Sequence, residues 1–230
     1  MSETPKISLY NQDNDSPCLA YDIQYDMVYA DCIYESTDFN WVYNAMSLVK
    51  IGGVLIVQSD WHTIASYKVL LDDQVELCFV NWLVWKNEWG NFRKDRLHQV
   101  HDDILIYSRG DTHKFYPERI QVNKVTKNAG LNPSGRETKT ATSWIDDICL
   151  TTTSKERVKL PDGSLVKWQK PESLMERLLL PFTDEGNFVL DYFMGTGTMG
   201  VVCKKNNRNY AGIENNSVIF NLASERIDAV

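Results

Sequence analysis

Residues 191–198 hold residue types that can bind a ligand. The stretch reads Asp-Tyr-Phe-Met-Gly-Thr-Gly-Thr, so an acid and two glycines stand where an apolar run turns into a helical pattern. Glycines let a ligand approach the backbone closely, and the first turn of a helix offers unpaired N–H groups. Sixteen residues after Thr198, Glu214 ends the next apolar run, where a carboxylate could accept hydrogen bonds from both hydroxyls of a ribose. The two features together favour a nucleoside ligand over a plain strand–helix turn. A nicotinamide dinucleotide is disfavoured, because its fingerprint requires a third glycine at a fixed spacing.

A second strand end carries an acid and an aromatic residue. Residues 25–31 predict a buried strand that ends in Asp31, and Tyr34 follows shortly after it. Taken alone, the two residues are more typical of an ordinary strand end and a packing aromatic than of a site. They gain interest because ligands of open α/β sheets bind beyond the carboxyl ends of the strands.

The elements that must position these residues predict an α/β protein whose sheet is covered on both faces. The chain has 230 residues, of which 43% are hydrophobic, enough for one buried domain and too few for two large ones. The predicted strands are residues 25–31, 52–60, 75–87, 102–110, 187–193 and 209–214. The predicted helices are residues 39–50, 171–182 and 200–207. The first four strands and the short helices between them indicate half of a doubly wound sheet.

Residues 111–167 differ from the rest of the chain. They are polar, have weak periodicity and contain turn signals at 132–135 and 161–163. From Arg109 to Lys170 the chain holds 12 Lys or Arg against 7 Asp or Glu, although the whole chain has a net charge of −7. A basic segment on an acidic body suits a protein that touches phosphates with one face, and it is equally typical of a solvated loop. We predict an inserted recognition region within a single domain, residues 1–230.

The cysteines and the hydropathy of the chain indicate the cellular compartment in which the protein works. The five cysteines have neither close pairs nor a metal-type spacing with the four histidines, so neither a disulfide framework nor a zinc site is expected. The first residues lack the apolar run of a signal peptide, and no stretch reaches the length of a membrane span. These features predict a soluble, cytoplasmic protein that does not engage a membrane.

Three motifs within the C-terminal part resemble those of the amino-methyltransferases of DNA. Residues 191–198 resemble the family's Asp-Pro-Phe-x-Gly-Ser-Gly-Thr, with Tyr192 in place of proline. Lys170-Pro171 resembles the Lys-Pro segment that opens a helix beside the methionine part of the cofactor, and residues 208–214 resemble Arg-x-Tyr-x-Gly-Ile-Glu. The resemblance implies a Rossmann-like methyltransferase sheet that binds S-adenosyl-L-methionine. The implied cofactor-binding residues are Lys170, Pro171, Asp191, Phe193, Gly195, Thr196, Gly197, Thr198 and Glu214.

The catalytic motif of that family, Asp-Pro-Pro-Tyr, is matched by Asp31-Cys32-Ile33-Tyr34. It precedes the cofactor motif, which is similar to the order in the circularly permuted β class, and residues 101–105 resemble that family's His-Glu-x-Ile-Leu strand. The resemblance implies that Asp31 and the Cys32 carbonyl accept the N–H bonds of an exocyclic amine and localise its lone pair. Tyr34 would stack on the extruded base, a contact worth about 1–3 kcal/mol. Both prolines are missing, so the loop is less preorganised and the site is either divergent or inactive.

Several functions fit this resemblance. Asp31 in the first motif position favours adenine N6 in double-stranded DNA, and cytosine N4 is the alternative because its chemistry at nitrogen is the same. A catalytically inactive partner subunit that still binds the cofactor or DNA is a second alternative, and an RNA or protein substrate is a third. Methylation of cytosine carbon 5 through Cys32 is disfavoured, because the Pro-Cys-Gln surroundings of that nucleophile are absent. Relatives in this class often form homodimers.

Overall fold

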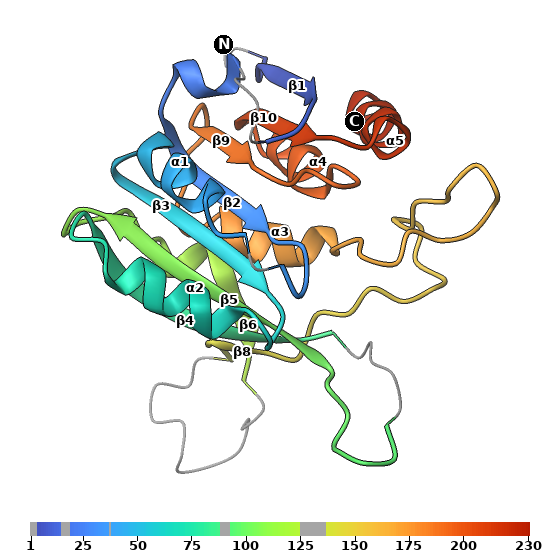
Figure 1. The fold of residues 1–230 in the computed structure, drawn as a ribbon, viewed down its shortest axis with the longest axis horizontal. Helices are drawn as coiled ribbons and strands as arrows, with labels where there is room; N and C mark the ends of the chain where they lie inside the picture. The colour runs from blue at the N-terminus through green and yellow to red at the C-terminus, as the bar shows by residue number, and fades with distance from the viewer. Residues whose placement is uncertain (1–3, 15–18, 37, 88–92, 125–136) are drawn as a thin grey trace.

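The computed structural model describes residues 4–14, 19–36, 38–87, 93–124 and 137–230 (Figure 1). An eight-stranded sheet runs through its centre in the order β1-β10-β9-β2-β3-β5-β4-β8. All neighbouring strands are parallel except at β5, which is antiparallel to both β3 and β4. The strands are β1 Ile7–Asn11, β2 Tyr25–Asp31, β3 Val49–Ser59, β4 Leu77–Lys86, β5 His101–Arg109, β8 Trp144–Ile145, β9 Phe188–Asp191 and β10 Asn209–Glu214.

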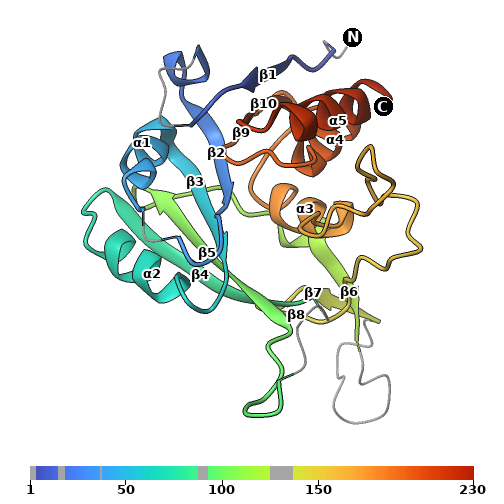
Figure 2. The same ribbon diagram turned by 45° about the vertical axis from the view of Figure 1, so that its right-hand side comes forward.

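Helices cover both faces of this sheet (Figure 2). Helices α1 (Trp41–Leu48) and α2 (Ile64–Asp72) pack on one face, and α3 (Glu172–Leu179), α4 (Thr198–Lys205) and α5 (Ser217–Asp228) pack on the other. Central strand β2 is buried on both sides, because Met27 and Tyr29 face the core under α3–α5 while Val28 and Ala30 face the core under α1 and α2. The predicted doubly wound, mostly parallel α/β sheet is therefore confirmed.

The strand order reverses between β9 and β2, and this point positions the site. After β2 the chain crosses through α1 to β3, whereas after β9 it crosses through α4 to β10, on the opposite side. In open α/β sheets such a reversal leaves a crevice beyond the carboxyl ends of the two strands. Asp31 ends β2 and Asp191 ends β9, so both lie at this crevice.

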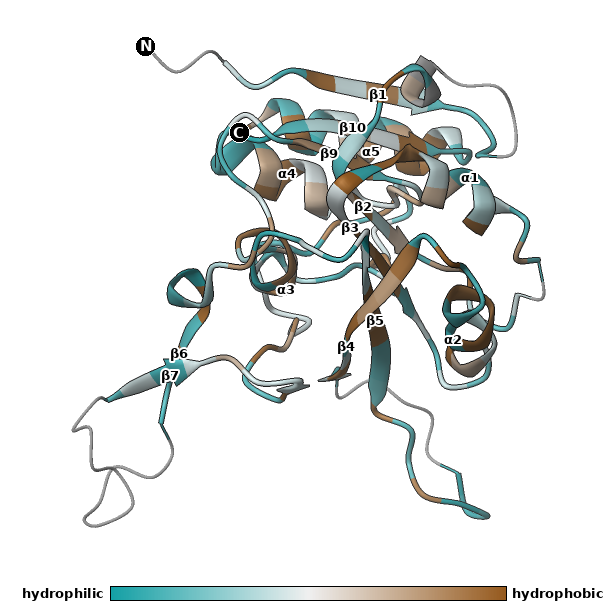
Figure 3. Cartoon of the chain, turned by 90° about the vertical axis from the view of Figure 1, so that its left-hand side faces the viewer, coloured by the Kyte–Doolittle hydropathy of each residue, from teal (hydrophilic) through white to brown (hydrophobic). Residues whose placement is uncertain are grey.

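The segment predicted as a recognition region has two parts. Strands β6 (Gln121–Asn123) and β7 (Thr138–Thr140) form a hydrophilic hairpin that projects from the body (Figure 3), and the predicted turn at 132–135 lies outside the described residues. The predicted turn at 161–163 is present, with Gly163 at φ 83°. The later part returns to the body, since β8 pairs with β4 and Ile148 is buried in the core. It is thus more ordered than its weak periodicity suggested.

Some bounds differ from those predicted. The helix predicted at 39–50 ends at Leu48, because Val49 takes an extended conformation and begins β3. Strand β1 was not predicted; it pairs with β10 at the edge of the sheet, and the C-terminal helix α5 lies near this edge (Figure 1). Within the described ranges, no helix is both long and apolar enough to span a membrane.

Candidate functional site

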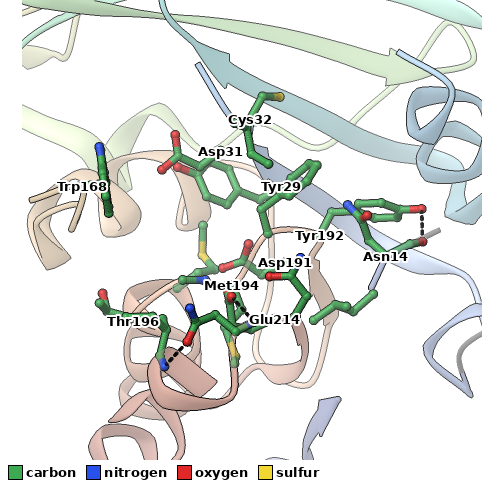
Figure 4. Close-up of a pocket in the computed structure, with 18 of the residues that line it drawn as sticks. Asn14, Tyr29, Asp31, Cys32, Trp168, Asp191, Tyr192, Met194, Thr196 and Glu214 are labelled. Atoms are coloured by element: carbon green, nitrogen blue, oxygen red, sulfur yellow. Dashed lines mark hydrogen bonds between the residues drawn. The ribbon is translucent and has the colours of Figure 1, made fainter. Parts of the chain in front are cut away.

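A cavity of about 690 Å³ opens at the carboxyl ends of β2, β9 and β10. In Figure 4, Asp31 and Cys32 lie toward one end, Glu214 lies toward the other, and Asp191 lies between them. Both predicted motifs therefore meet in one space. The predicted residues that line it are Asp31, Cys32, Ile33, Tyr34, Lys170, Asp191, Phe193, Gly195, Thr196, Thr198 and Glu214. Pro171 and Gly197 are not among the residues that line the cavity.

Glu214 has a fixed carboxylate at one end of the cavity. Its Oε2 accepts a hydrogen bond from the backbone N–H of Gly195 at 3.0 Å, and its Oε1 accepts one from the N–H of Asn216 at 2.8 Å. Each carboxylate oxygen has a second lone pair, so the side chain is held in place and can still accept bonds from a ligand.

Asp191 is a buried carboxylate with unused bonding capacity. Its Oδ2 accepts a hydrogen bond from the Tyr210 hydroxyl at 3.3 Å, and its buried Oδ1 has no partner among the described residues. Burial, with repulsion from Asp31 adding to it, raises the pKa of Asp191 to about 8. A buried oxygen without a partner indicates that a ligand with a hydrogen-bond donor belongs here.

The two glycines of the turn have different surroundings. Both adopt positive φ, 51° at Gly195 and 72° at Gly197. A Cβ on Gly195 would meet nothing within 4 Å, whereas a Cβ on Gly197 would lie 2.9 Å from Cδ1 of Ile227 in α5. Gly195 therefore leaves room in the cavity, and Gly197 lets α4 approach α5.

Lys170 reaches the strand end of β2. Pro171 caps the start of α3, and the backbone oxygen of Lys170 accepts a hydrogen bond from the Thr198 hydroxyl at 3.1 Å. The ammonium lies 2.7 Å from Oδ2 of Asp31 and 3.6 Å from Oδ2 of Asp102. The resemblance implied a place near the methionine part of a cofactor, which stays a prediction, and the structure brings the Lys170 ammonium to the predicted catalytic end of the same cavity.

Asp31 has one paired and one unpaired oxygen. Oδ2 binds Lys170, and the buried Oδ1 has no partner among the described residues. Burial raises the pKa of Asp31 to about 6, with the Lys170 ammonium opposing the shift and the Asp102 carboxylate adding to it. Asp31 is thus ionised above about pH 6, and its buried Oδ1 is then a charged acceptor with no partner among the described residues.

The rest of the predicted catalytic motif forms a loop with one buried and two exposed side chains. Tyr34 is 37% exposed, and its hydroxyl donates to Oδ2 of Asp102 at 2.8 Å. Ile33 is exposed, whereas Cys32 is buried and its backbone N–H donates to the oxygen of Gln58 at 2.9 Å. Burial raises the pKa of the Cys32 thiol, which disfavours the thiolate that a covalent mechanism would need.

Sequence reasoning missed several residues that line the cavity. Trp168 is 70% exposed at its margin, and its position two residues before Lys170 could have drawn attention to it. Tyr192, which stands where the resembled family has proline, is buried with its ring 5.5 Å from that of Trp41. Asn14 accepts a hydrogen bond from the Tyr192 hydroxyl at 3.3 Å, and no sequence signal could have placed it there because the pairing of β1 with β10 brings it in.

Comparison with known proteins gives relatives of one kind. The sequence profile of a family described as DNA methylase matches residues 10–225. The type II methyltransferase M.HpaI of Haemophilus parainfluenzae is 28% identical over 202 residues, which are 85% of this chain and 60% of that protein. The type II methyltransferase M.HinfI of Haemophilus influenzae is 28% identical over 197 residues, which are 84% of this chain and 51% of that protein. The chain thus spans only about half to three fifths of these relatives' lengths.

Solved structures share the fold. The complex of M1.HpyAVI with SAM superposes with a TM-score of 0.67 at 21% identity, covering 96% of this chain and 99% of that one. The cytosine-N4-specific PvuII DNA methyltransferase superposes with a TM-score of 0.67 at 15% identity, covering 97% and 86%. At these identities the likeness concerns the arrangement of the sheet and helices.

Proposed function

The chain belongs to the family of N6/N4 DNA methylases, and we propose that it transfers a methyl group from S-adenosyl-L-methionine to the exocyclic N6 amine of adenine in double-stranded DNA. The observation that carries this proposal is the single cavity that holds the Asp31 end and the Glu214 end together. A methyl donor and an amine must meet in one space with their reacting atoms aligned.

The cofactor is proposed to occupy the part of the cavity between Asp191 and Glu214. S-adenosyl-L-methionine supplies an electrophilic methyl group on a sulfonium centre. Glu214 would bind the ribose hydroxyls, and the unpaired Oδ1 of Asp191 would accept a bond from a donor of the same ligand. The residues proposed to complete this subsite are Phe193, Gly195, Thr196 and Thr198.

The target amine is proposed to bind at Asp31. An exocyclic amine shares its lone pair with the ring and is a poor nucleophile. Oδ1 of Asp31 would accept one N–H bond and the backbone carbonyl of Cys32 the other, which localises the lone pair on nitrogen. The nitrogen would form its bond to the methyl carbon as the methyl–sulfur bond breaks, so that the sulfonium becomes a neutral thioether. The Asp31 carboxylate would stabilise the positive charge that develops on nitrogen and accept the proton that the nitrogen loses. Tyr34 would stack on the base outside the duplex.

DNA recognition is proposed for residues 111–167. The basic excess of this part of the chain and the projecting β6–β7 hairpin support the assignment. The hairpin is the part to exchange in a test, since Ile145 and Ile148 belong to the core and Val166 lines the cavity. A chimera with another hairpin between Gln121 and Thr140 should change DNA affinity and leave cofactor affinity intact.

Cytosine N4 is the second candidate target. It is favoured by the fold shared with a solved methyltransferase named as cytosine-N4-specific, while Asp31 in the first motif position favours adenine. Incubation of the protein with unmethylated DNA and labelled cofactor, followed by mass analysis of the nucleosides, separates the two outcomes. Binding of the cofactor with no methylated nucleoside of either kind would contradict transfer and identify an inactive binding subunit.

A further inference from the structure

The loop that carries Tyr34 is held by a backbone hydrogen bond that a proline could not make. The backbone N–H of Cys32 donates to the oxygen of Gln58 at 2.9 Å, a bond that belongs to the last pair of the β2–β3 ladder, Asp31–Gln58. A proline at position 32 has no N–H and could not make this bond. Where the resembled motif has proline, this chain therefore has a hydrogen bond to strand β3.

The side chain of Gln58 leads from this hydrogen bond to a buried carboxylate. Gln58 is fully buried, its Oε1 accepts a bond from the Tyr29 hydroxyl at 2.8 Å, and its Nε2 donates to Oδ2 of Asp102 at 3.0 Å. Asp102 lies on β5 and is 3% exposed. A side chain that both donates and accepts in this way has a single orientation, so it fixes the position of Asp102 relative to β2.

Asp102 accepts hydrogen bonds from three segments and forms an ion pair with a fourth. Its Oδ2 accepts from the Tyr34 hydroxyl at 2.8 Å and from Gln58, and it lies 3.6 Å from the Lys170 ammonium. Its Oδ1 accepts from Nδ2 of Asn87 at 2.9 Å. A buried carboxylate with this many donors is rigid, and its charge acts on every group around it.

Two consequences follow for the catalytic end of the cavity. The Tyr34 hydroxyl is held by Asp102 while the residue stays partly exposed, which restricts the orientation of the ring. The Lys170 ammonium is shared between two carboxylates, which keeps it on Oδ2 of Asp31 and leaves Oδ1 as the unpaired acceptor.

We propose that Asp102 is a positioning residue of the methyl-transfer site, which sets the Tyr34 ring and the Lys170–Asp31 pair in place of the rigidity that prolines would give the loop. The proposal rests on the proposed function, because it gives these groups their task. Asp102 does not touch the reacting atoms; it acts through Tyr34 and Lys170.

The test compares Asp102→Asn with Asp103→Asn. Asp103 is the next residue of β5, is also buried, and accepts a bond from Nε1 of Trp82 at 2.7 Å, away from the catalytic groups. Single-turnover methyl transfer should slow by about 10- to 100-fold in Asp102→Asn, with cofactor affinity unchanged, because small displacements of reacting groups have effects of this size. Asp103→Asn should keep the wild-type rate, and an equal loss in both variants would overturn the proposal.

Two further measurements separate positioning from general stability. Tyr34→Phe combined with Asp102→Asn should lose little more rate than the more affected single variant, whereas independent effects would multiply and contradict the coupling. Because the Asp102 charge raises the pKa of Asp31, the acidic limb of the rate should move to lower pH in Asp102→Asn.

The same shift can be measured without activity. Titration of the Asp31 carboxyl by carbon NMR, in protein without DNA, should show a lower pKa in Asp102→Asn than in wild type. An unchanged titration would overturn the electrostatic part of the proposal. A shifted titration in a protein that transfers no methyl group would instead contradict the proposed function and leave the coupling in place.

Discussion

The ammonium of Lys170 lies 2.7 Å from Oδ2 of Asp31. A lysine two residues before α3 therefore pairs with the carboxylate at the end of β2. The remaining oxygen, Oδ1, is buried and unpaired among the described residues. One oxygen of the carboxylate is therefore ion-paired, and the other is buried with unused hydrogen-bonding capacity.

Removing the lysine should move the pH dependence of transfer upward. The Lys170 ammonium opposes the burial that raises the pKa of Asp31 to about 6, so Lys170→Gln should raise that pKa further. Only the ionised carboxylate is the charged acceptor, so the rate should rise with pH through the folded pKa of Asp31 and level off above it. Rate–pH profiles should show a higher midpoint for Lys170→Gln than for wild type, and a lower midpoint would contradict the pairing.

Substitution of Asp31 should affect chemistry and spare cofactor binding. Asp31→Ala should reduce the transfer rate by about 100- to 1000-fold, the usual effect of removing one preorganised electrostatic contact. Asp31→Asn should also be severely slowed, because an amide is a weaker acceptor and has no charge. Calorimetry with S-adenosyl-L-methionine provides the control. Transfer that survives in Asp31→Ala would place the catalytic centre elsewhere.

Cys32 should tolerate serine better than proline. Cys32→Ser keeps the backbone, and most activity should remain because the proposed role belongs to the carbonyl. Cys32→Pro restores the residue of the resembled motif but removes the N–H bond to Gln58 and leaves a carbonyl unpaired, at a cost of about 1–3 kcal/mol. Thermal unfolding and transfer assays should rank the variants in this order. Complete loss in Cys32→Ser would instead support a covalent thiol.

Alanine substitutions at the two glycines of the turn should have different effects, one on cofactor affinity and the other on stability. Gly195→Ala places a methyl group in the open cavity, so cofactor affinity should fall more than the unfolding temperature. Gly197→Ala places it 2.9 Å from Ile227, so the unfolding temperature should fall more than affinity. Both variants carry the strain of an alanine at positive φ, about 1–2 kcal/mol, which makes each the control for the other. Calorimetry and thermal melts that give the opposite ranking would contradict this assignment.

Asp191 should make the unliganded protein less stable as pH rises. Its folded pKa of about 8 lies above its ordinary value of 3.8, so the folded state holds a proton that the unfolded chain has lost. Stability should therefore be greatest below about pH 4 for this group and fall through the window up to about pH 8. Asp191→Asn removes this dependence, so its melting temperature relative to wild type should increase across that window, while its cofactor affinity should be lower.

The strongest sequence patterns gave both the elements and the residues of the cavity. Strands β2 and β10 have the predicted bounds, because their apolar runs are continuous and each ends in an acid. Helix α5 was not predicted, although Asn216 caps it by accepting from the N–H groups of Val218 and Ile219, a signal that was readable in the sequence. Strand β1 is short and half-exposed at the sheet edge, so its hydropathy pattern is weak.

Long-range contacts lay beyond the reach of sequence patterns. The direction of the Lys170 side chain depends on where α3 passes the end of β2, and the three hydrogen bonds and one ion pair of Asp102 depend on strand order. The resemblance placed residues 101–105 on a strand but assigned that strand no task at the site. The contacts of Asp102 depend on how β5 is aligned with its neighbouring strands, and the pattern of a single segment does not determine that alignment.

The register between β2 and β9 has a mechanical consequence. Tyr29 lies opposite Asp191, and the N–H of Tyr192 donates to the oxygen of Tyr29 at 2.8 Å, so the strand ends bearing Asp31 and Asp191 share one backbone ladder. These two strand ends cannot move apart or together without breaking the hydrogen bonds between β2 and β9. The separation between these two strand ends is thus fixed when the sheet forms. Under the proposed function, a target base would therefore have to leave its stack and reach a site that does not move toward it.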